Sequence, residues 1–311
     1  MGTGGGRRRL GVEDLRGVAR AVFGRRELVS VERLRGGTSK GVYRLRAADG
    51  DGAVAYVWHP DEDYWPDRET TGSDLFAHAH ERLSALGVRV PRLFFLEPGG
   101  PLGDVTVVED VRGGTLEQLI ARDPARAERV LARLGAMVRA LHGHAADPAR
   151  HDRVEHDVLR RALTDLAESA ARVDRIADAH DRLADLLRTR HAAVAPRSRF
   201  GLVHGELGPD HVLVDADRDE PVLIDIEGVK PFDVEWEHAF LELRFGAHYH
   251  HFADPDPALD PARLALYRLA TYLSLVAGPS CLLDGDFPDR AGMLEIVRQN
   301  VARTLAQLPD R

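Results

Sequence analysis

The stretch RFGLVHGELGPDHVLVDADRDEPVLIDIEG, residues 199–228, decides the fold more than any other part of the chain. Two runs rich in β-branched residues, 211–215 and 221–227, flank a short turn-forming segment and predict a β-hairpin. If the hairpin closes symmetrically, His211 lies opposite Asp225, and Glu206 lies just upstream of the same end. A carboxylate, an imidazole and a second carboxylate gathered in this way suit metal-assisted phosphoryl transfer.

His204-Gly205-Glu206, His211 and Asp225 carry a resemblance to a known family. This part of the chain resembles the catalytic core of the phosphotransferase enzyme family, the aminoglycoside-kinase-like branch of the protein-kinase-like fold. In that pattern the Asp of a His-Gly-Asp loop accepts the proton of the substrate hydroxyl, and an Asn and a second Asp hold magnesium. His204 and Asp225 match the pattern directly, whereas Glu206 stands in place of the loop Asp and His211 in place of the Asn.

The resemblance implies catalytic roles for residues of the loop. Glu206 would orient and partly deprotonate the acceptor hydroxyl, because positioning matters more than basicity in a loose phosphoryl-transfer transition state. Asp210 is the nearest other carboxylate and is the alternative base. His204 is expected to orient the loop through backbone hydrogen bonds.

The same resemblance implies that Asp225 holds magnesium at the phosphates of ATP or GTP. The part played by His211 stays open, because magnesium prefers oxygen ligands to an imidazole. Either His211 binds manganese or zinc, or it hydrogen-bonds phosphate or loop carbonyls while Asp225 and Glu227 hold the second metal ion. The single asparagine, Asn300, is remote in sequence.

A glycine-rich turn, GGTSKG at 36–41, lets backbone amides approach phosphates. Members of the resembled family place a lysine on the following strand, but this strand carries Trp58 and His59 there. The only lysines in the sequence are Lys40 and Lys230. Phosphate neutralisation is therefore expected from one of them or from an arginine such as Arg44. The predicted nucleotide-binding residues are Gly37, Thr38, Ser39, Lys40, Gly41, Glu109, Val111 and Lys230, with Glu109 and Val111 in the hinge that reads adenine.

Asp233 and Glu237 match the family's Asp-x-x-x-Asp stretch at the start of the next helix. The resemblance implies structural support from Asp233, as a helix N-cap and as a brace beneath the catalytic loop. Trp236 is expected to pack below it. Glu81 is a guess for the helix partner of the nucleotide-binding lysine.

Two further patterns lie downstream of the hairpin. Clustered histidines such as HYHH, 248–251, can bind zinc, but no acidic partner is fixed nearby in sequence, and a surface or substrate-lining loop is favoured. The acidic segments 254–260 and 284–289 either attract an amine-bearing acceptor or cap helices.

Composition narrows the class of protein. The chain has 311 residues, 44% hydrophobic and 30% charged, as in an ordinary globular protein. We find no run of 18 apolar residues, so no spanning helix and no membrane partner are expected. The formal charge of −8 argues against nucleic-acid binding and suits a cationic ligand. One cysteine, Cys281, excludes an internal disulfide, and a cytoplasmic location is expected.

The order of predicted elements gives an α+β, bilobal protein-kinase-like architecture. Residues 1–9 are expected to form a loose tail, 10–111 a small β-rich N-lobe that binds nucleotide, and 112–311 a larger helical C-lobe with the catalytic loop, metal and acceptor sites. A continuous helical period over 154–194 predicts one long helical region in the C-lobe. The resemblance covers roughly residues 28–280.

We therefore expect an ATP- or GTP-dependent kinase with Mg²⁺ as cofactor, acting on a hydroxyl of a small-molecule acceptor. An aminoglycoside or another amine-bearing sugar or antibiotic is the expected acceptor class. The alternative is a catalytically impaired kinase-like protein that binds nucleotide or ligand, which the residues at 206, 211 and 58 keep open.

Overall fold

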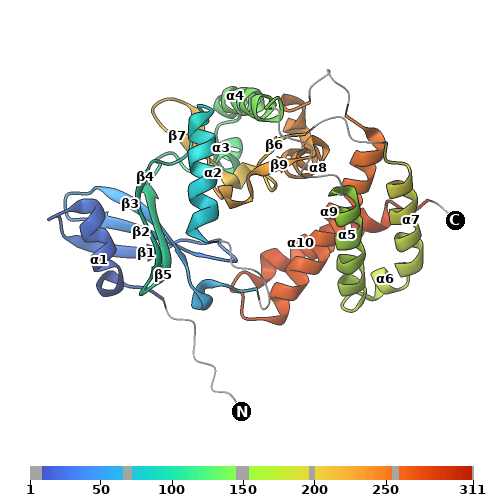
Figure 1. The fold of residues 1–311 in the computed structure, drawn as a ribbon, viewed down its shortest axis with the longest axis horizontal. Helices are drawn as coiled ribbons and strands as arrows, with labels where there is room; N and C mark the ends of the chain where they lie inside the picture. Colours follow the sequence, from blue (N-terminus) through green and yellow to red (C-terminus); the bar gives the residue numbers. More distant parts are fainter. Residues whose placement is uncertain (1–8, 66–71, 145–153, 196–199, 254–258, 310–311) are drawn as a thin grey trace, which may run out of the picture. The chain divides into compact units, whose positions relative to one another are not determined.

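The computed structural model describes residues 9–65, 72–144, 154–195, 200–253 and 259–309. The chain forms two compact units, Met1–Thr115 with Leu213–Glu227, and Leu116–Val212 with Gly228–Arg311. The first is built around a β-sheet and the second is mainly helical (Figure 1). This confirms the expected α+β class, but Leu213–Glu227, which the sequence places in the C-lobe, belongs to the first unit.

The sheet of the first unit is antiparallel, with strand order β1-β2-β3-β5-β4. Tyr43 pairs with Ala55, and Ala55 pairs in turn with Val107, so the three central strands share one register row. The strands are β1 (Leu28–Arg33), β2 (Gly41–Ala47), β3 (Gly52–Trp58), β4 (Leu93–Gly100) and β5 (Gly103–Glu109).

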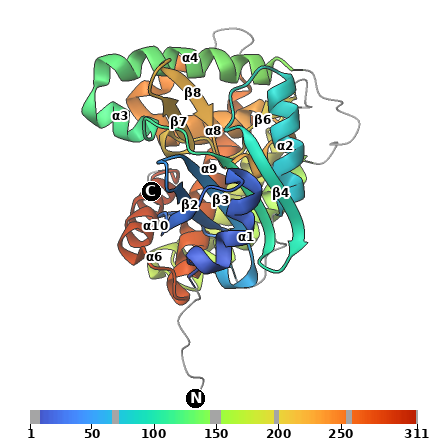
Figure 2. The same ribbon diagram turned by 90° about the vertical axis from the view of Figure 1, so that its left-hand side faces the viewer.

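The two faces of this sheet are covered by different helices. Alternate residues of β3 point to opposite faces. Ala55 and its register partners Tyr43 and Val107 pack with α1 (Val12–Phe23) in one hydrophobic core. The opposite face of β3 carries Tyr56 and Trp58. Their ring centroids lie 5.7 and 6.3 Å from that of Phe76 in α2 (Ser73–Ala85). Figures 1 and 2 show α2 alongside β4.

The predicted hairpin is present as β7 (Val212–Asp215) and β8 (Glu220–Leu223). Backbone hydrogen bonds tie it to the rest of the first unit. Val214 N–H donates to the Gly114 carbonyl at 3.0 Å, Ala216 N–H to the Arg112 carbonyl at 2.9 Å and Leu223 N–H to the Arg89 carbonyl at 3.0 Å. The strands are shorter than predicted. β8 ends before Asp225, which has φ of 59°, and a 3₁₀ turn, η4 (Ile226–Gly228), follows. Neither His211 nor Asp225 therefore belongs to the paired strands.

The second unit packs helices around a core that includes Leu166, Leu183, Leu266 and Leu273. The predicted helical region 154–194 is interrupted, because Val173 takes an extended conformation and begins a new turn. Strand β6 (Gly201–Val203) pairs with β9 (Lys230–Phe232) and is followed directly by the loop that is predicted to be catalytic. The helices are α3 (Leu116–Arg122), α4 (Pro124–His142), α5 (Val154–Ala170), α6 (Asp174–Ala177), α7 (His180–Ala192), α8 (Val234–Phe245), α9 (Pro261–Asp284) and α10 (Arg290–Leu305); the 3₁₀ turns are η1 (Pro60–Glu62) in the first unit and η3 (Pro209–His211) and η5 (Gly246–His251) in the second.

Helix α9 is long and apolar enough, by length and composition alone, to cross a membrane, which the sequence reading did not anticipate. Of its most apolar stretch, 61% is buried inside the protein. Leu266, Tyr267 and Leu273 of this helix are fully buried and belong to the core of the second unit. These contacts are those of a core helix.

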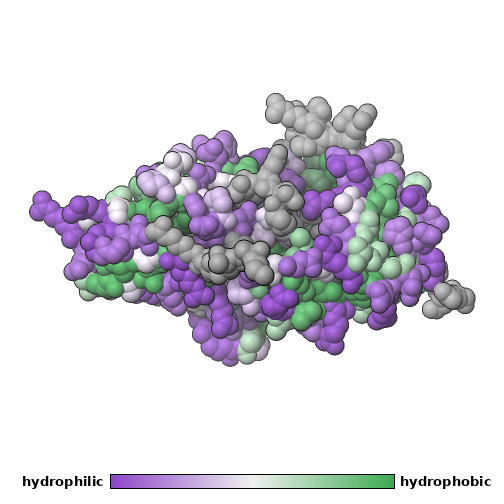
Figure 3. Space-filling view, turned by 90° about the horizontal axis from the view of Figure 1, so that it is seen from below, coloured by the Kyte–Doolittle hydropathy of each residue, from purple (hydrophilic) through white to green (hydrophobic). Residues whose placement is uncertain are grey.

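The surface is mixed in polarity. Figure 3 shows hydrophilic residues over most of the face it draws, with hydrophobic residues in separate patches. Among the described residues, the large hydrophobic side chains that are exposed are Val29, Leu75, Phe94, Leu96 and Leu294.

Substitution of Gly113 tests whether the β7–β8 hairpin must pack closely against the segment that follows β5. Gly113 has φ of +140°, and an added Cβ would lie 2.0 Å from the Val214 carbonyl oxygen. We expect Gly113→Ala to lower the free energy of unfolding by about 1–3 kcal/mol. Gly17→Ala is the matched control, because nothing lies within 4 Å of its added Cβ and it is inside α1, where alanine should add about 0.5–1 kcal/mol. Chemical unfolding of both variants measures the difference, and equal stabilities would contradict the close docking.

Candidate functional site

Lys40, Asp225 and Glu227 form a lysine–carboxylate cluster within the first unit. The Lys40 ammonium lies 2.6 Å from Asp225 Oδ1 and also hydrogen-bonds to Glu227 Oε1. Lys40 and Glu227 are buried, with 7% and 6% of their side chains exposed, whereas 41% of the Asp225 side chain is exposed. The structure thus brings together three residues that sequence analysis assigned to nucleotide and metal binding.

The charges in this cluster support one another. Burial acts to lower the pKa of Lys40, but the neighbouring charges of Asp225 and Glu227 outweigh it, and the pKa is raised above its usual value. Burial raises the pKa of Glu227, and the Lys40 ammonium opposes that shift. Lys40 therefore remains a cation in the cluster, held next to the more exposed carboxylate of Asp225.

The ammonium group of Lys40 lies beside strand β3. Its Nζ lies 5.1 Å from the ring centroid of Tyr56 and 5.7 Å from that of Trp58, both on β3. These are distances at which a cation is attracted to an aromatic face. The ammonium group therefore reaches β3 from the turn before β2, although the lysine itself is not on β3.

The glycine-rich turn is held by contacts that the sequence did not reveal. Gly37 has φ of +74°, and a Cβ there would lie 2.4 Å from the Lys40 carbonyl oxygen, so a glycine is required. Glu62 in η1 is buried and binds Arg33 at 3.0 Å and the Tyr43 hydroxyl. Tyr64 N–H donates to the Thr38 carbonyl at 2.8 Å.

The predicted hinge residues carry ion pairs. Glu109 at the end of β5 binds Arg89 at 2.8 Å. The next residue, Asp110, binds Arg44 at 3.2 Å and Arg46 at 3.3 Å. Arg44 is thus engaged at the hinge and is a poorer candidate than Lys40 for the phosphates. Val111 is buried.

The predicted catalytic loop, residues 204–210, belongs to the second unit and is braced from α8. The buried carboxylate of Glu237 accepts hydrogen bonds from the backbone N–H groups of His204 and, at 3.2 Å, Gly205. Trp236 Nε1 donates to the Gly205 carbonyl at 3.2 Å. Gly205 itself has φ of 98°. These bonds fix the backbone and leave the side chain of Glu206 exposed.

His211 makes a contact that one of the two earlier alternatives expected. Its Nδ1 lies 2.8 Å from the Glu206 carbonyl oxygen, which accepts only, so Nδ1 carries the proton. Its ring stacks on that of His204, with centroids 6.1 Å apart. His211 therefore holds the loop backbone, and its role in catalysis stays a prediction.

Asp210 is tied to an arginine. Its carboxylate forms an ion pair with Arg244 near the end of α8. Burial acts to raise the pKa of Asp210, but His211 and Arg244 outweigh it, and the pKa lies below its usual value. A carboxylate paired in this way is less suited than Glu206 to accept a proton.

The two lysines of the chain lie in different units. Lys230 is exposed on β9, in register with Val203 of β6, and its Nζ lies 4.6 Å from the ring centroid of Phe232. The charge of Glu206 acts on its ammonium group. Lys230 thus belongs to the same unit as the predicted catalytic loop, and Lys40 belongs to the same unit as the predicted metal ligands.

Asp233 supports α9 rather than the loop. It occupies the N-cap position of α8, but its side chain makes no capping hydrogen bond, which corrects the predicted cap. The fully buried carboxylate accepts from Arg263 at 2.9 Å and from the Tyr267 hydroxyl. The brace expected from Asp233 is supplied by Glu237, and Trp236 packs 5.7 Å from Tyr267 between centroids.

Comparison with known proteins settles the family. The model of the Phosphotransferase enzyme family matches residues 30–278. The chain belongs to this family. No curated protein sequence matches it significantly.

Solved structures agree with this fold. A thermostable mutant of aminoglycoside phosphotransferase APH(4)-Ia is 16% identical, with 92% of this chain and 98% of that chain covered and a TM-score of 0.65. An aminoglycoside-3'-phosphotransferase of type VIII is 23% identical, with 84% and 98% covered and a TM-score of 0.54. An ethanolamine kinase of Plasmodium vivax is 10% identical, with 88% and 82% covered and a TM-score of 0.57. At these identities the likeness concerns the fold.

Magnesium, which the phosphotransferase family pattern implies, fits the lysine–carboxylate cluster. The cluster offers the carboxylate oxygens of Asp225 and Glu227, and oxygen ligands are those that magnesium prefers. Asp225 combines an exposed carboxylate with a left-handed backbone, a conformation that aspartate tolerates better than most residues. Asp225 would hold the metal ion, with Glu227 behind it. Glu81 is exposed on α2 and is not one of the carboxylates bound by Lys40, so that guess is wrong.

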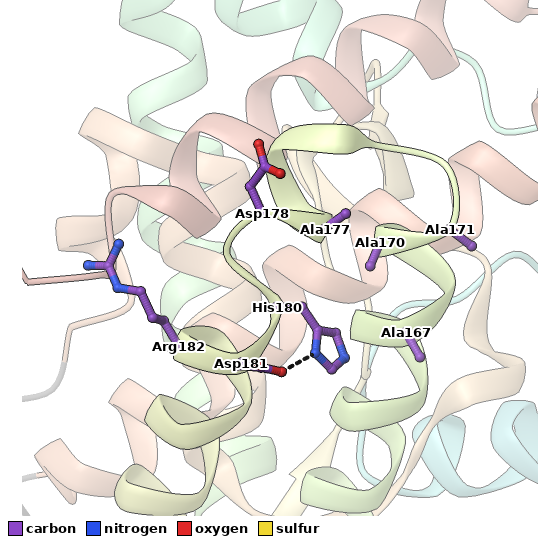
Figure 4. Close-up of a pocket in the computed structure, with 8 residues that line it drawn as sticks. All are labelled: Ala167, Ala170, Ala171, Ala177, Asp178, His180, Asp181 and Arg182. Carbon is purple, nitrogen blue, oxygen red and sulfur yellow. Dashed lines mark hydrogen bonds and ion pairs between the residues drawn. The ribbon is translucent and has the colours of Figure 1, made fainter.

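A hollow of about 540 Å³ lies elsewhere in the second unit, between α5 and the start of α7 (Figure 4). It contains none of the predicted site residues and is lined by Ala167, Ala170, Ala171, Ala177, Asp178, His180, Asp181 and Arg182. We assign neither nucleotide nor acceptor to it.

The acidic segments act in part as helix caps. Asp260 accepts hydrogen bonds from Ala262 and Arg263 N–H at the start of α9, and Asp289 accepts from Gly292 N–H at the start of α10. Residues 254–258 of the first acidic segment lie outside the described part of the chain. Attraction of an amine-bearing acceptor stays a prediction.

Glu237 should make stability depend on pH. Burial raises the pKa of Glu237 to about 7, although the hydrogen bonds that its carboxylate accepts from backbone N–H groups favour the charged form. Because this pKa exceeds that of the unfolded chain, folding favours protonated Glu237, and that contribution is lost as pH rises through about 7. Relative to Glu237→Gln, the parent should lose up to about 3 kcal/mol of unfolding free energy between roughly pH 5 and pH 8. Urea unfolding over this range measures it; a difference that does not change with pH would rule the assignment out.

Proposed function

We propose that this protein is a magnesium-dependent kinase that transfers the γ-phosphoryl group of ATP or GTP to a hydroxyl of a small, amine-bearing molecule. The lysine–carboxylate cluster is the observation that carries the proposal. It holds a cation for phosphate and an exposed carboxylate for a metal ion 2.6 Å apart, within one compact unit. Membership of the phosphotransferase family supports a small-molecule phosphotransferase.

Each residue has a chemical part in this proposal. Lys40 neutralises phosphate oxygens, and Asp225 holds the metal ion with Glu227 behind it. When bound, magnesium supplies further charge neutralisation at the phosphates. Glu206 accepts a hydrogen bond from the acceptor hydroxyl and takes up its proton as the oxygen bonds to the γ-phosphorus. The bond from that phosphorus to the bridging oxygen breaks, and ADP or GDP leaves. His211 and Glu237 keep the loop backbone in place for this step.

Structures of relatives support nucleotide use and the acceptor class. APH(4)-Ia has been solved in ternary complexes with ADP and hygromycin B and with AMP-PNP and hygromycin B, and LicA with AMP. A fructosamine-3-kinase candidate from Thermobifida fusca also shares the fold, at 18% identity and a TM-score of 0.54. We propose an aminoglycoside-like antibiotic, an amino sugar or a choline-like amine as acceptor, in keeping with the formal charge of −8.

A second candidate function is binding of nucleotide or ligand without transfer. Glu206 and His211, at the places of the family's Asp and Asn, are the specific observations in its favour.

An assay of transfer from radiolabelled ATP to a panel of amine-bearing acceptors separates these functions. With Mg²⁺ present, the parent should label an acceptor. Glu206→Gln should still bind nucleotide but transfer on the order of 10²–10⁴-fold more slowly. Asp225→Asn should abolish the magnesium-dependent reaction while circular dichroism shows an intact fold. No label on any acceptor, with nucleotide still bound, would favour the binding protein; full activity of Glu206→Gln would move the base to Asp210.

The two lysines should differ in their effect on nucleotide affinity. Lys40→Met removes the cation beside Asp225 and should weaken binding of a non-hydrolysable ATP analogue by roughly 10- to 150-fold, the value of a charge-assisted contact. Lys230→Met removes a similar charge from the second unit and should weaken binding of the analogue less. Calorimetric titration of both variants, with thermal unfolding as a check on folding, gives the ratio. Equal affinities in Lys40→Met and the parent would assign the phosphates to an arginine.

A further inference from the structure

Four side chains from α4 and η5 gather in the second unit, apart from the predicted kinase residues. His251 Nε2 lies 2.8 Å from Glu128 Oε2, and His248 Nδ1 lies 3.2 Å from Glu128 Oε1. The rings of His250 and His251 are 4.1 Å apart between centroids. The ligand atoms of Glu128, His250 and His251 all lie within 4.8 Å of one another. The acidic partner that the HYHH run lacks in sequence is therefore Glu128 of α4.

We propose that Glu128, His250 and His251 bind a zinc ion. Two imidazole nitrogens and one carboxylate oxygen form a usual donor set for zinc, which a water molecule completes to four. In tetrahedral zinc sites the ligand atoms are about 3.4 Å apart, so only small side-chain rotations separate this cluster from a closed site. The proposal does not depend on the kinase function.

The hydrogen bonds around the cluster prepare its nitrogens for a metal ion. His250 Nδ1 lies 2.8 Å from the Ala247 carbonyl oxygen and must donate to it, so the lone pair is on Nε2. Such a bond from the second ring nitrogen to a backbone carbonyl is typical of metal-bound histidines. His248 orients the Glu128 carboxylate through its other oxygen. Zinc would displace the proton that His251 Nε2 shares with Glu128.

The backbone that carries the histidines is fixed. Residues 128, 135 and 139 are spaced by seven and four, so they share one face of α4. A Cβ on Gly135 would lie 2.1 Å from the His251 carbonyl oxygen, to which Arg139 donates at 2.6 Å. The next residue, Phe252, is fully buried against Phe245, with centroids 4.5 Å apart. A site held in this way needs little ordering when it binds zinc.

The test is zinc binding by the full chain. After removal of metal with a chelator, the parent and variants compete with a chromogenic chelator for Zn²⁺. We expect one tight equivalent in the parent and an affinity lower by at least 10- to 100-fold in His250→Ala and Glu128→Gln. His250 and Glu128 are exposed, so their loss should not disturb the core, and circular dichroism checks this.

Two controls keep the outcome specific. His180→Ala removes an exposed histidine that binds a carboxylate, Asp181, at 3.0 Å but is not part of this cluster (Figure 4), and it should bind zinc like the parent. Asp225→Asn shows whether zinc binds at the predicted magnesium ligands instead. This variant should still bind one equivalent of zinc as tightly as the parent. The proposal is overturned if His250→Ala and the parent have equal affinities, or if only Asp225→Asn loses the ion.

Discussion

The ion pairs of Lys40 with Asp225 and Glu227 tie together distant parts of the first unit. They join positions 185 and 187 residues apart in sequence. Both Lys40 and Glu227 are buried, and a buried charge deprived of its partner costs about 3–5 kcal/mol. The glycine-rich turn and the segment after β8 must therefore fold together. This explains why residues 213–227 belong to the first unit although most of the chain around them belongs to the second.

Much of the fold follows from local patterns. The helix at 12–23, the strands that became β2, β3 and β5, and the β7–β8 hairpin follow from hydrophobic period and turn residues. Asp225 was identified through the resemblance to the family pattern, and Glu227 as the carboxylate that follows it on the same segment. The break at Val173 was missed, since the helical period continues across it in sequence. The short strand β9 was missed because Lys230-Pro231-Phe232 has no strand pattern of its own and is ordered by pairing with β6.

The parts of the site that could not be predicted are long-range contacts of ordinary residue types. Nothing local marks Glu62 as the buried partner of Tyr43, or Glu237 as the acceptor of two loop N–H groups. Glu128 is one acidic residue among many on helical surfaces until η5 folds against α4. Each of these carboxylates gains its role from where tertiary packing places a donor, and a single sequence does not contain that information.

The two departures from the family pattern in the predicted catalytic loop are in contact with each other. His211, at the family's Asn position, binds the carbonyl group of Glu206, at the family's Asp position. The same loop is also held by Glu237 and Trp236, both of which bind the backbone of Gly205. The bond from His211 goes to the backbone carbonyl of Glu206, so it holds the loop and leaves the Glu206 carboxylate uninvolved. A loop braced by His211, Glu237 and Trp236, with the Glu206 carboxylate exposed, meets the requirement that a proposed kinase has for positioning an acceptor hydroxyl.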